Sequence, residues 1–259
     1  MKKNCKTEQR AVLTRAGETL GVAGNRVKLI IGVLICILAT VSVLLIVSAL
    51  CLLVDFEALY ATSAYLGALV EVAIVLVQFI LILLLAAPLY LGLYASALDM
   101  RRGVSFALAD LFMFFDSPAA YLRGWGIIIR IVGRAYPYLI LYGVSLMAYL
   151  TESDIFYGIV GVTAVPLLLL SLYTTGRSFP FLTFALCNPC EPLGHTMKNV
   201  KTMTRKRTLS IFVFRMRLLG RFLLSLLSVG VVTLFHTLPL TILATHEYAF
   251  ALEQAAEEN

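Results

Sequence analysis

Two thiols and a histidine form the first group of side chains that could do chemistry. The sequence CNPC places Cys187 and Cys190 three residues apart and shortly before His195. This spacing could serve redox chemistry or metal binding, but a thioredoxin motif needs a strand and helix around it, and this set lacks a fourth metal ligand. In a reducing compartment free thiols are the default. We therefore expect no metal and no cofactor.

A pair of arginines forms the second group. Arg130 and Arg134 stand four residues apart and would share one face of a helix. Near the cytoplasmic end of a span, such side chains extend to the headgroup layer. If they faced the inside of a helix bundle, they would bind an anionic group. We favour the first interpretation and keep the second as the alternative.

The third group consists of polar residues within apolar stretches. Glu71 stands at the outer end of one stretch, where exposure at the interface is the simplest interpretation. A proton-coupling role would need partners inside the membrane. Gln78 and His236 are the available ones, and each is expected to make an interhelical hydrogen bond instead.

The stretch RKRTLSIFVFRMRLLGRFLLSLL, residues 205–227, combines fixed positive charge with apolar residues. On a helical wheel of about 100° per residue, its cations gather in one sector and its apolar residues in the opposite one. The cations are Lys206, Arg207, Arg217 and Arg221, with Arg215 at the edge, and the apolar stripe is Leu209, Phe212, Met216, Leu219 and Leu223. We predict an interfacial helix over 205–221 that turns near Gly220 into a span, its cations facing anionic headgroups. A specific headgroup or phosphate site is the alternative.

The chain as a whole is composed for a lipid environment. Its 259 residues are 60% hydrophobic and only 14% charged. A helix that crosses a hydrocarbon core of ~30 Å needs ~20 apolar residues, because lipid cannot satisfy exposed backbone groups. Five segments meet this requirement, and the first follows too many polar residues to be a signal peptide. The predicted spans are residues 29–54, 72–93, 131–150, 155–175 and 222–245. The predicted class is an all-α, polytopic membrane protein.

The basic residues predict the orientation of these spans. Lys and Arg remain on the cytoplasmic side. With Arg134 at the inner end of its span, all 21 basic residues and six acids lie inside, which gives +15, and nine acids lie outside, which gives −9. The predicted order is therefore a cytoplasmic basic segment over 1–28, a transmembrane domain over 29–245 and an acidic extracytoplasmic tail over 246–259. Nucleic-acid binding is disfavoured, because this topology accounts for the basic charge.

The segment 104–115 is the candidate for a sixth span, but it is too short and carries Asp110. Its apolar residues recur at the spacing of one helix face. They are Val104, Ala107, Leu108, Leu111, Phe112 and Phe115. We predict an amphipathic helix on the cytoplasmic surface.

Enzyme activity is disfavoured. The sequence contains no HExxH, GxSxG, phosphate-binding lysine loop or dinucleotide fingerprint. The cytoplasmic segments 1–28, 94–130 and 176–221 are too short to hold a catalytic domain of their own.

Two patches resemble an uncharacterised family of multi-pass membrane proteins of Gram-positive bacteria. The first is APLYLGLYASALDMRRGVSFALADLFMFF, and the second runs from Glu191 to Leu252. The second contains a Met-Lys helix, a basic interfacial helix, a Gly-bearing span, a Pro and a late Tyr in the family's order. The chain departs from the family at Arg217 or Leu218, where an aromatic is usual, and at Pro239-Leu240, where the family has Pro-Tyr. The resemblance implies a bacterial cell-membrane protein and assigns no functional residues.

These observations predict a non-enzymatic integral membrane protein that acts in envelope homeostasis or as an accessory protein. Its basic inner face would contact anionic lipids, and its partners would be the bilayer and a membrane protein or a second copy of the chain. The alternative is a permease subunit or small transporter, in which Arg130, Arg134 or Glu71 contacts an anionic or amphipathic solute. The absence of a detectable inverted repeat argues weakly against a stand-alone carrier.

Overall fold

The computed structural model describes residues 2–257 except 23, 105, 135–136, 138–139, 142, 146–153, 177–178, 206 and 228–232. All regular structure within these residues is helical, which confirms the predicted all-α class. The elements are α1 (Lys2–Gly21), α2 (Asn25–Cys51), α3 (Phe56–Thr62), α4 (Ala64–Leu81), η1 (Ile82–Ala86), α5 (Ala87–Arg101), η2 (Leu108–Phe112), α6 (Pro118–Val132), α8 (Asp154–Gly176), α9 (Phe179–Cys187), α10 (Leu193–Thr204), α11 (Thr208–Leu227), η3 (Thr233–Thr237) and α12 (Leu238–Glu257). Segments η1 and η3 are π-helical, and η2 is a 3-10 helix.

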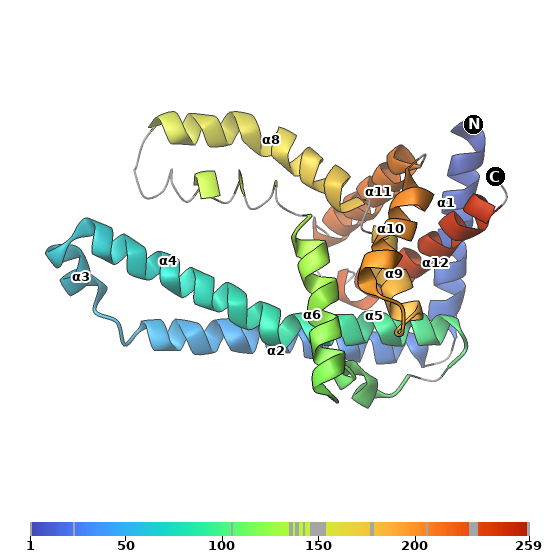
Figure 1. The fold of residues 1–259 in the computed structure, drawn as a ribbon, viewed down its shortest axis with the longest axis horizontal. Helices are drawn as coiled ribbons and strands as arrows, with labels where there is room; N and C mark the ends of the chain where they lie inside the picture. The colour runs from blue at the N-terminus through green and yellow to red at the C-terminus, as the bar shows by residue number, and fades with distance from the viewer. Residues whose placement is uncertain are drawn as a thin grey trace.

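The helices form a head from which two arms extend in the same direction (Figure 1). The head consists of α1, α5, α6, α9, α10, α11 and α12 with η2. The first arm consists of α2 and α4, which pack along each other and are joined at the far end by α3. The second arm contains α8. Both ends of the chain lie in the head (Figure 1).

The core lies in the head, where α5 and α12 contribute to both of its hydrophobic clusters. The larger cluster joins these two helices to α1, α2, η2 and α11. The smaller cluster joins them to α6, α9 and α10. The two helices therefore hold the head together, and α12 is buried without interruption from Ile242 to Ala249.

Two prolines interrupt the backbone hydrogen bonds of long helices. Pro88 and Pro239 have no N–H to donate to the carbonyl four residues earlier, and a π-helical turn precedes each of them. The first freed carbonyl, of Leu84, accepts a hydrogen bond of 3.1 Å from the Tyr121 hydroxyl. The second, of Phe235, accepts one of 3.2 Å from Nε of Arg26. Side chains from distant parts of the sequence thus replace the missing donors.

The segment predicted only as a basic stretch, residues 1–28, contains the helix α1. Its buried residues Val12, Ala16 and Leu20 recur at a spacing of four and pack into the larger cluster. Gly24, with φ of 85°, takes the left-handed conformation that lets the chain turn from α1 into α2. Helix α1 therefore belongs to the core.

The prediction of an amphipathic helix over 104–115 is wrong. Residues 108–112 form a short 3-10 helix, and of the predicted apolar face only Leu111 is buried. Phe106 and Phe114 enter the core in its place. The reason is the close contact with α5: a Cβ added to Gly92 would lie 2.2 Å from the Leu111 carbonyl oxygen. The backbone itself packs on α5, which a periodic pattern of side chains does not reveal.

Two helical stretches of the described residues are long and apolar enough to cross a membrane, Asn25–Cys51 and Leu69–Arg101. They include most of the predicted spans 29–54 and 72–93. A shorter apolar stretch, Tyr157–Leu170, lies within the predicted span 155–175. Half of the predicted span 131–150 falls outside the described residues.

The structure differs from the predicted end of the chain in two respects. First, α11 continues through Gly220 to Leu227, so no turn occurs there, and the predicted span 222–245 is divided among α11, η3 and α12. Second, residues 246–257 belong to α12, which packs against α1, so they do not form a separate tail.

Replacing the donor to the Leu84 carbonyl should destabilise the head. We expect Tyr121→Phe to lower the free energy of unfolding by about 1 kcal/mol, because a carbonyl without a donor loses its hydrogen bond. Denaturant unfolding in detergent, followed by the fluorescence of Trp125, measures the change. The double variant with Pro88→Ala is the control, since the added N–H can donate to Leu84. Equal loss in the single and double variants would contradict this account of the proline.

Candidate functional site

The paired arginines of the sequence prediction do not share a helix face. Helix α6 ends at Val132, so Arg134 lies in the turn that follows it. Arg130 is exposed, and its Nη1 donates to the Gly126 carbonyl at 2.9 Å. The backbone carbonyl of Arg134 accepts a hydrogen bond from Oγ1 of Thr174 in α8. The structure therefore does not join the two side chains into one site.

The four arginines predicted on the interfacial helix occupy different environments. Arg207 precedes α11, and its Nη2 donates to the Ala255 carbonyl of α12 at 3.1 Å. Arg221 is exposed, whereas Arg215 and Arg217 are half-buried. Of these four, Arg215 lines a cavity of about 250 Å³ between α5, α11 and α12.

The apolar stripe predicted on this helix is largely uncovered by protein. Leu209, Met216 and Leu223 are exposed, and the buried face of α11 is instead Ile211, Phe214 and Leu218. Exposure of this stripe is what contact with acyl chains would require.

The three polar residues of apolar stretches lie apart from the head's cavities. Glu71 and Gln78 are half-buried in α4 and lie seven residues apart, on one face of that helix. His236 is exposed in η3. None of the three lines either of the two cavities described here.

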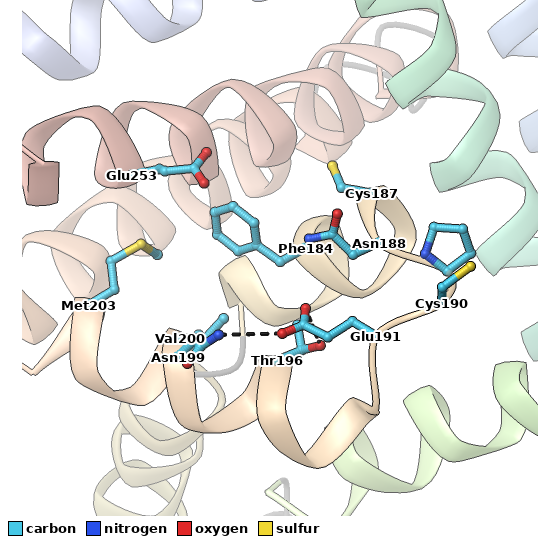
Figure 2. A pocket seen from close by; sticks show the side chains of 11 residues that line it. Phe184, Cys187, Asn188, Cys190, Glu191, Thr196, Asn199, Val200, Met203 and Glu253 are labelled. Atoms are coloured by element: carbon cyan, nitrogen blue, oxygen red, sulfur yellow. Dashed lines mark hydrogen bonds between the residues drawn. The ribbon is translucent and has the colours of Figure 1, made fainter.

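A larger cleft of about 600 Å³ forms around the CNPC sequence. Helix α9 ends at Cys187, the loop carries Pro189 and Cys190 across the bottom, and α10 and α12 form the other walls. The lining residues are Phe184, Cys187, Asn188, Pro189, Cys190, Glu191, Thr196, Asn199, Val200, Met203 and Glu253. Figure 2 shows Glu253 on one side of the cleft, and Glu191 with Asn199 on the other.

Glu191 fixes the loop onto the start of α10. Its carboxylate bonds to Nδ1 of His195, accepts from Oγ1 of Thr196 at 3.0 Å and accepts from Nδ2 of Asn199 at 3.4 Å. The bond from His195, followed by that from Thr196, lowers the pKa of Glu191. His195 is therefore engaged with this carboxylate, rather than with the two thiols.

Arg123 of α6 holds the same loop from the other side. Its guanidinium donates to the backbone carbonyls of Ala185, Asn188 and Glu191 at 3.1, 2.7 and 3.0 Å. The last turn of a helix leaves its carbonyls without partners, and a cation there also interacts favourably with the helix dipole. Arg123 thus supports the floor of the cleft, a role that its position in a basic loop did not predict.

The two thiols have different surroundings. Cys187 is half-buried, and burial raises its pKa although the nearby Arg102 opposes the shift. Cys190 is exposed. A raised pKa keeps Cys187 protonated and unreactive, since the thiolate is the nucleophile and the metal ligand. Among the described residues, no group of three or more His, Cys, Asp or Glu side chains could hold a metal ion.

Glu253 is the second carboxylate of the cleft. Burial, and then repulsion from Glu257, raises its pKa. The cleft therefore presents one carboxylate bonded to its neighbours and one held in an environment that disfavours its charge. Together with Asn188 and Asn199, these groups could bind a polar ligand by hydrogen bonds. They do not form a nucleophile paired with a base, which acyl transfer would need.

A buried histidine ties α9 to α12 beneath the cleft. Oγ1 of Thr183 lies 3.0 Å from Nδ1 of His246, and Nε2 of His246 lies 2.8 Å from the Tyr94 carbonyl oxygen. Because that carbonyl can only accept, Nε2 carries the proton and Nδ1 accepts from Thr183. Next to it, Nε of Arg101 bonds to Oε1 of Glu247 at 2.6 Å. These contacts fix the relative position of the helices that line the cleft.

No protein-family model, curated protein or solved structure matches the chain. The resemblance to a family of bacterial membrane proteins is therefore still a prediction.

The buried histidine should make the stability of the head depend on pH. Burial lowers the pKa of His246 from 6.5 to about 4. Between these values the unfolded chain binds a proton that the folded chain excludes, so the free energy of unfolding is highest above pH 6.5 and falls as the pH drops towards 4. The full loss is about 3 kcal/mol.

Denaturant unfolding between pH 7 and pH 4 measures this effect. Carboxylates also titrate in this range, so the matched variant is His246→Gln, whose amide can make both hydrogen bonds without binding a proton. We expect a flatter pH dependence in the variant. The same slope in both proteins would show that His246 does not control it.

Proposed function

We propose that the protein is a multi-pass membrane protein whose two arms cross the bilayer from the side that holds the head. The observation that carries this proposal is the exposed apolar surface of the arms. Leu45 of α2 is 63% exposed, Leu69 of α4 is 70% exposed and Val162 of α8 is 77% exposed. Soluble proteins rarely expose large continuous apolar surfaces, because each such side chain costs about 1.5–3 kcal/mol relative to burial.

The distribution of acidic and basic residues supports the proposal that a bilayer, rather than a protein partner, covers the exposed apolar surfaces of the arms. The far end of the first arm carries Asp55 and Glu57 and no basic residue, whereas the head carries the arginines of α6 and α11, the lysines of α10 and the basic residues of the flanking loops. Basic residues are retained on the cytoplasmic side. The proposed orientation therefore places the head in the cytoplasm and the tips of the arms outside.

An even number of crossings fits this arrangement better than five. Helices α2 and α4 form one pair. We propose that α8 is the returning crossing of a second pair, whose outgoing crossing is the span predicted from the sequence at 131–150. The remaining apolar segment, 222–245, starts and ends in the head. Four crossings keep α1 and α12 on one side, and the acids of α12 then lie beside cations of the head, as the pair Arg101 and Glu247 does.

We propose a non-enzymatic accessory role in the cell envelope, exercised through anionic lipid. Exposed cations of the head, among them Arg130, Arg205 and Arg221, lie where anionic headgroups would meet them. Each such cation gains on the order of 1 kcal/mol near an anionic surface. The permease alternative has less support, because neither cavity described above is lined by Arg130, Arg134 or Glu71.

Labelling of single cysteines in intact bacterial cells tests the topology. In a chain without native cysteines, we expect Glu57→Cys to react with a membrane-impermeant maleimide from outside. Glu18→Cys in α1 and Gln254→Cys in α12 should react only after permeabilisation, because all three side chains are exposed but only the first lies beyond the bilayer. Reaction of Gln254→Cys from outside, or equal reaction of all three, would contradict the proposal.

Purification in mild detergent tests the accessory role separately. The protein should retain anionic lipid or a partner protein in excess of its share of the membrane, and mass spectrometry of the eluted complex measures both. Retention should fall with salt if exposed cations contribute, since salt screens exposed charges. A monomer that retains neither lipid nor protein would contradict this role even if the topology were correct.

A further inference from the structure

The cavity beside Arg215 combines one cation with an apolar wall. It lies between α5, α11 and α12 and has a volume of about 250 Å³. Its polar groups include Arg215, Tyr94 and Thr241, and its apolar wall includes Leu219, Phe222 and Leu238. We call this cavity the Arg215 slot. Its chemistry differs from that of the larger cleft, which carries carboxylates and no lining cation.

The cation of the slot is in an environment where an anion would be stabilised. Arg215 is half-buried and interacts electrostatically with the phenol of Tyr94, which is uncharged at neutral pH. A partly desolvated guanidinium gains more from a negative partner than one in water does, because the local dielectric is lower. Its planar donors also suit the paired oxygens of a phosphate or carboxylate.

The walls of the slot are held in place by buried contacts. The Tyr94 ring meets the ring of His246 edge to face at 5.8 Å, and the Tyr94 carbonyl accepts from the same histidine. On the side of α11, Leu218 is buried in the core. A ligand that entered would therefore find a preformed site and would pay little ordering cost.

The apolar wall borders further apolar side chains of the head that the protein leaves exposed. Phe222 is followed in α11 by Leu223 and Leu224, which are 50% and 70% exposed. On the other side, Phe235 precedes Leu238 and is also exposed. A slot of this volume is smaller than the ~300 Å³ at which ligand pockets usually begin. It suits one end of a long molecule, with the rest outside.

We propose that the Arg215 slot binds one anionic lipid, with its charged group at Arg215 and its acyl chain along Leu219 and Phe222. This inference rests on the proposed membrane location and adds a defined site to it. The general basic surface would attract many lipids weakly, whereas the slot selects a molecule with one negative group and an apolar chain. Neutral lipid lacks the first feature, and free phosphate lacks the second.

Binding of a fluorescent phosphatidylglycerol to the full chain in neutral detergent tests the proposal without depending on topology. We expect Arg215→Gln to weaken binding about tenfold, which corresponds to ~1.4 kcal/mol. Arg217→Gln is the matched control, because Arg217 is also half-buried in α11 but does not line the slot. Equal loss in both variants would overturn the proposal in favour of a general basic surface.

A second variant keeps the cation and fills the cavity. Leu219→Trp should also weaken binding, since the larger ring takes the place of the acyl chain, and wild-type affinity in this variant would overturn the proposal. Competition then identifies the ligand class. Unlabelled phosphatidylglycerol and oleate should displace the probe, whereas phosphatidylcholine and inorganic phosphate should not. Displacement by phosphatidylcholine would show that binding does not require a net negative charge. Displacement by phosphate would show that binding does not require an acyl chain. Either result would overturn the proposal.

Discussion

The contact between α1 and α12 is the constraint on which the rest of the structure depends. Val12 and Ala16 of α1 share a hydrophobic cluster with Tyr248 and Leu252 of α12, so the beginning and the end of the described chain lie together. If the arms cross a bilayer as proposed, every crossing that leaves the charged head must return to it, because such a head does not pass through hydrocarbon. The proposed crossings therefore come in pairs.

Two side-chain hydrogen bonds compensate for the backbone donors that Pro88 and Pro239 lack. Helices are suited to lipid because their backbone groups are satisfied within the helix, and each proline removes one donor. Tyr121 of α6 and Arg26 of α2 donate to the carbonyls that Pro88 and Pro239 leave without their helical partners. The first bond joins η1 to α6 and the second joins η3 to α2, so the bonds that satisfy the backbone also link helices that are distant in the sequence.

Sequence predicted the features that lipid imposes locally, and it missed those that depend on tertiary contacts. Uncharged runs such as 29–54 mark long apolar helices because a crossing needs a certain length. The end of α12 was predicted as an outer tail because it carries glutamates and no basic residue, yet Arg101 of another helix pairs with Glu247. The cleft could not be predicted, since Arg123, Glu191 and Glu253 come from distant parts of the chain. The neighbouring thiols of CNPC marked its location but not its chemistry.

Two surfaces of the head differ in chemistry: a polar cleft around Glu191 and Glu253, and a slot with Arg215 beside exposed apolar residues. Both require that α12 pack into the head. A pulsed electron paramagnetic resonance distance between spin labels at Glu18 and Gln254, in protein reconstituted in a bilayer, tests that packing most directly. The account predicts a distance well under the ~30 Å of the hydrocarbon core. A distance greater than ~30 Å would place the two helices on opposite sides and contradict it.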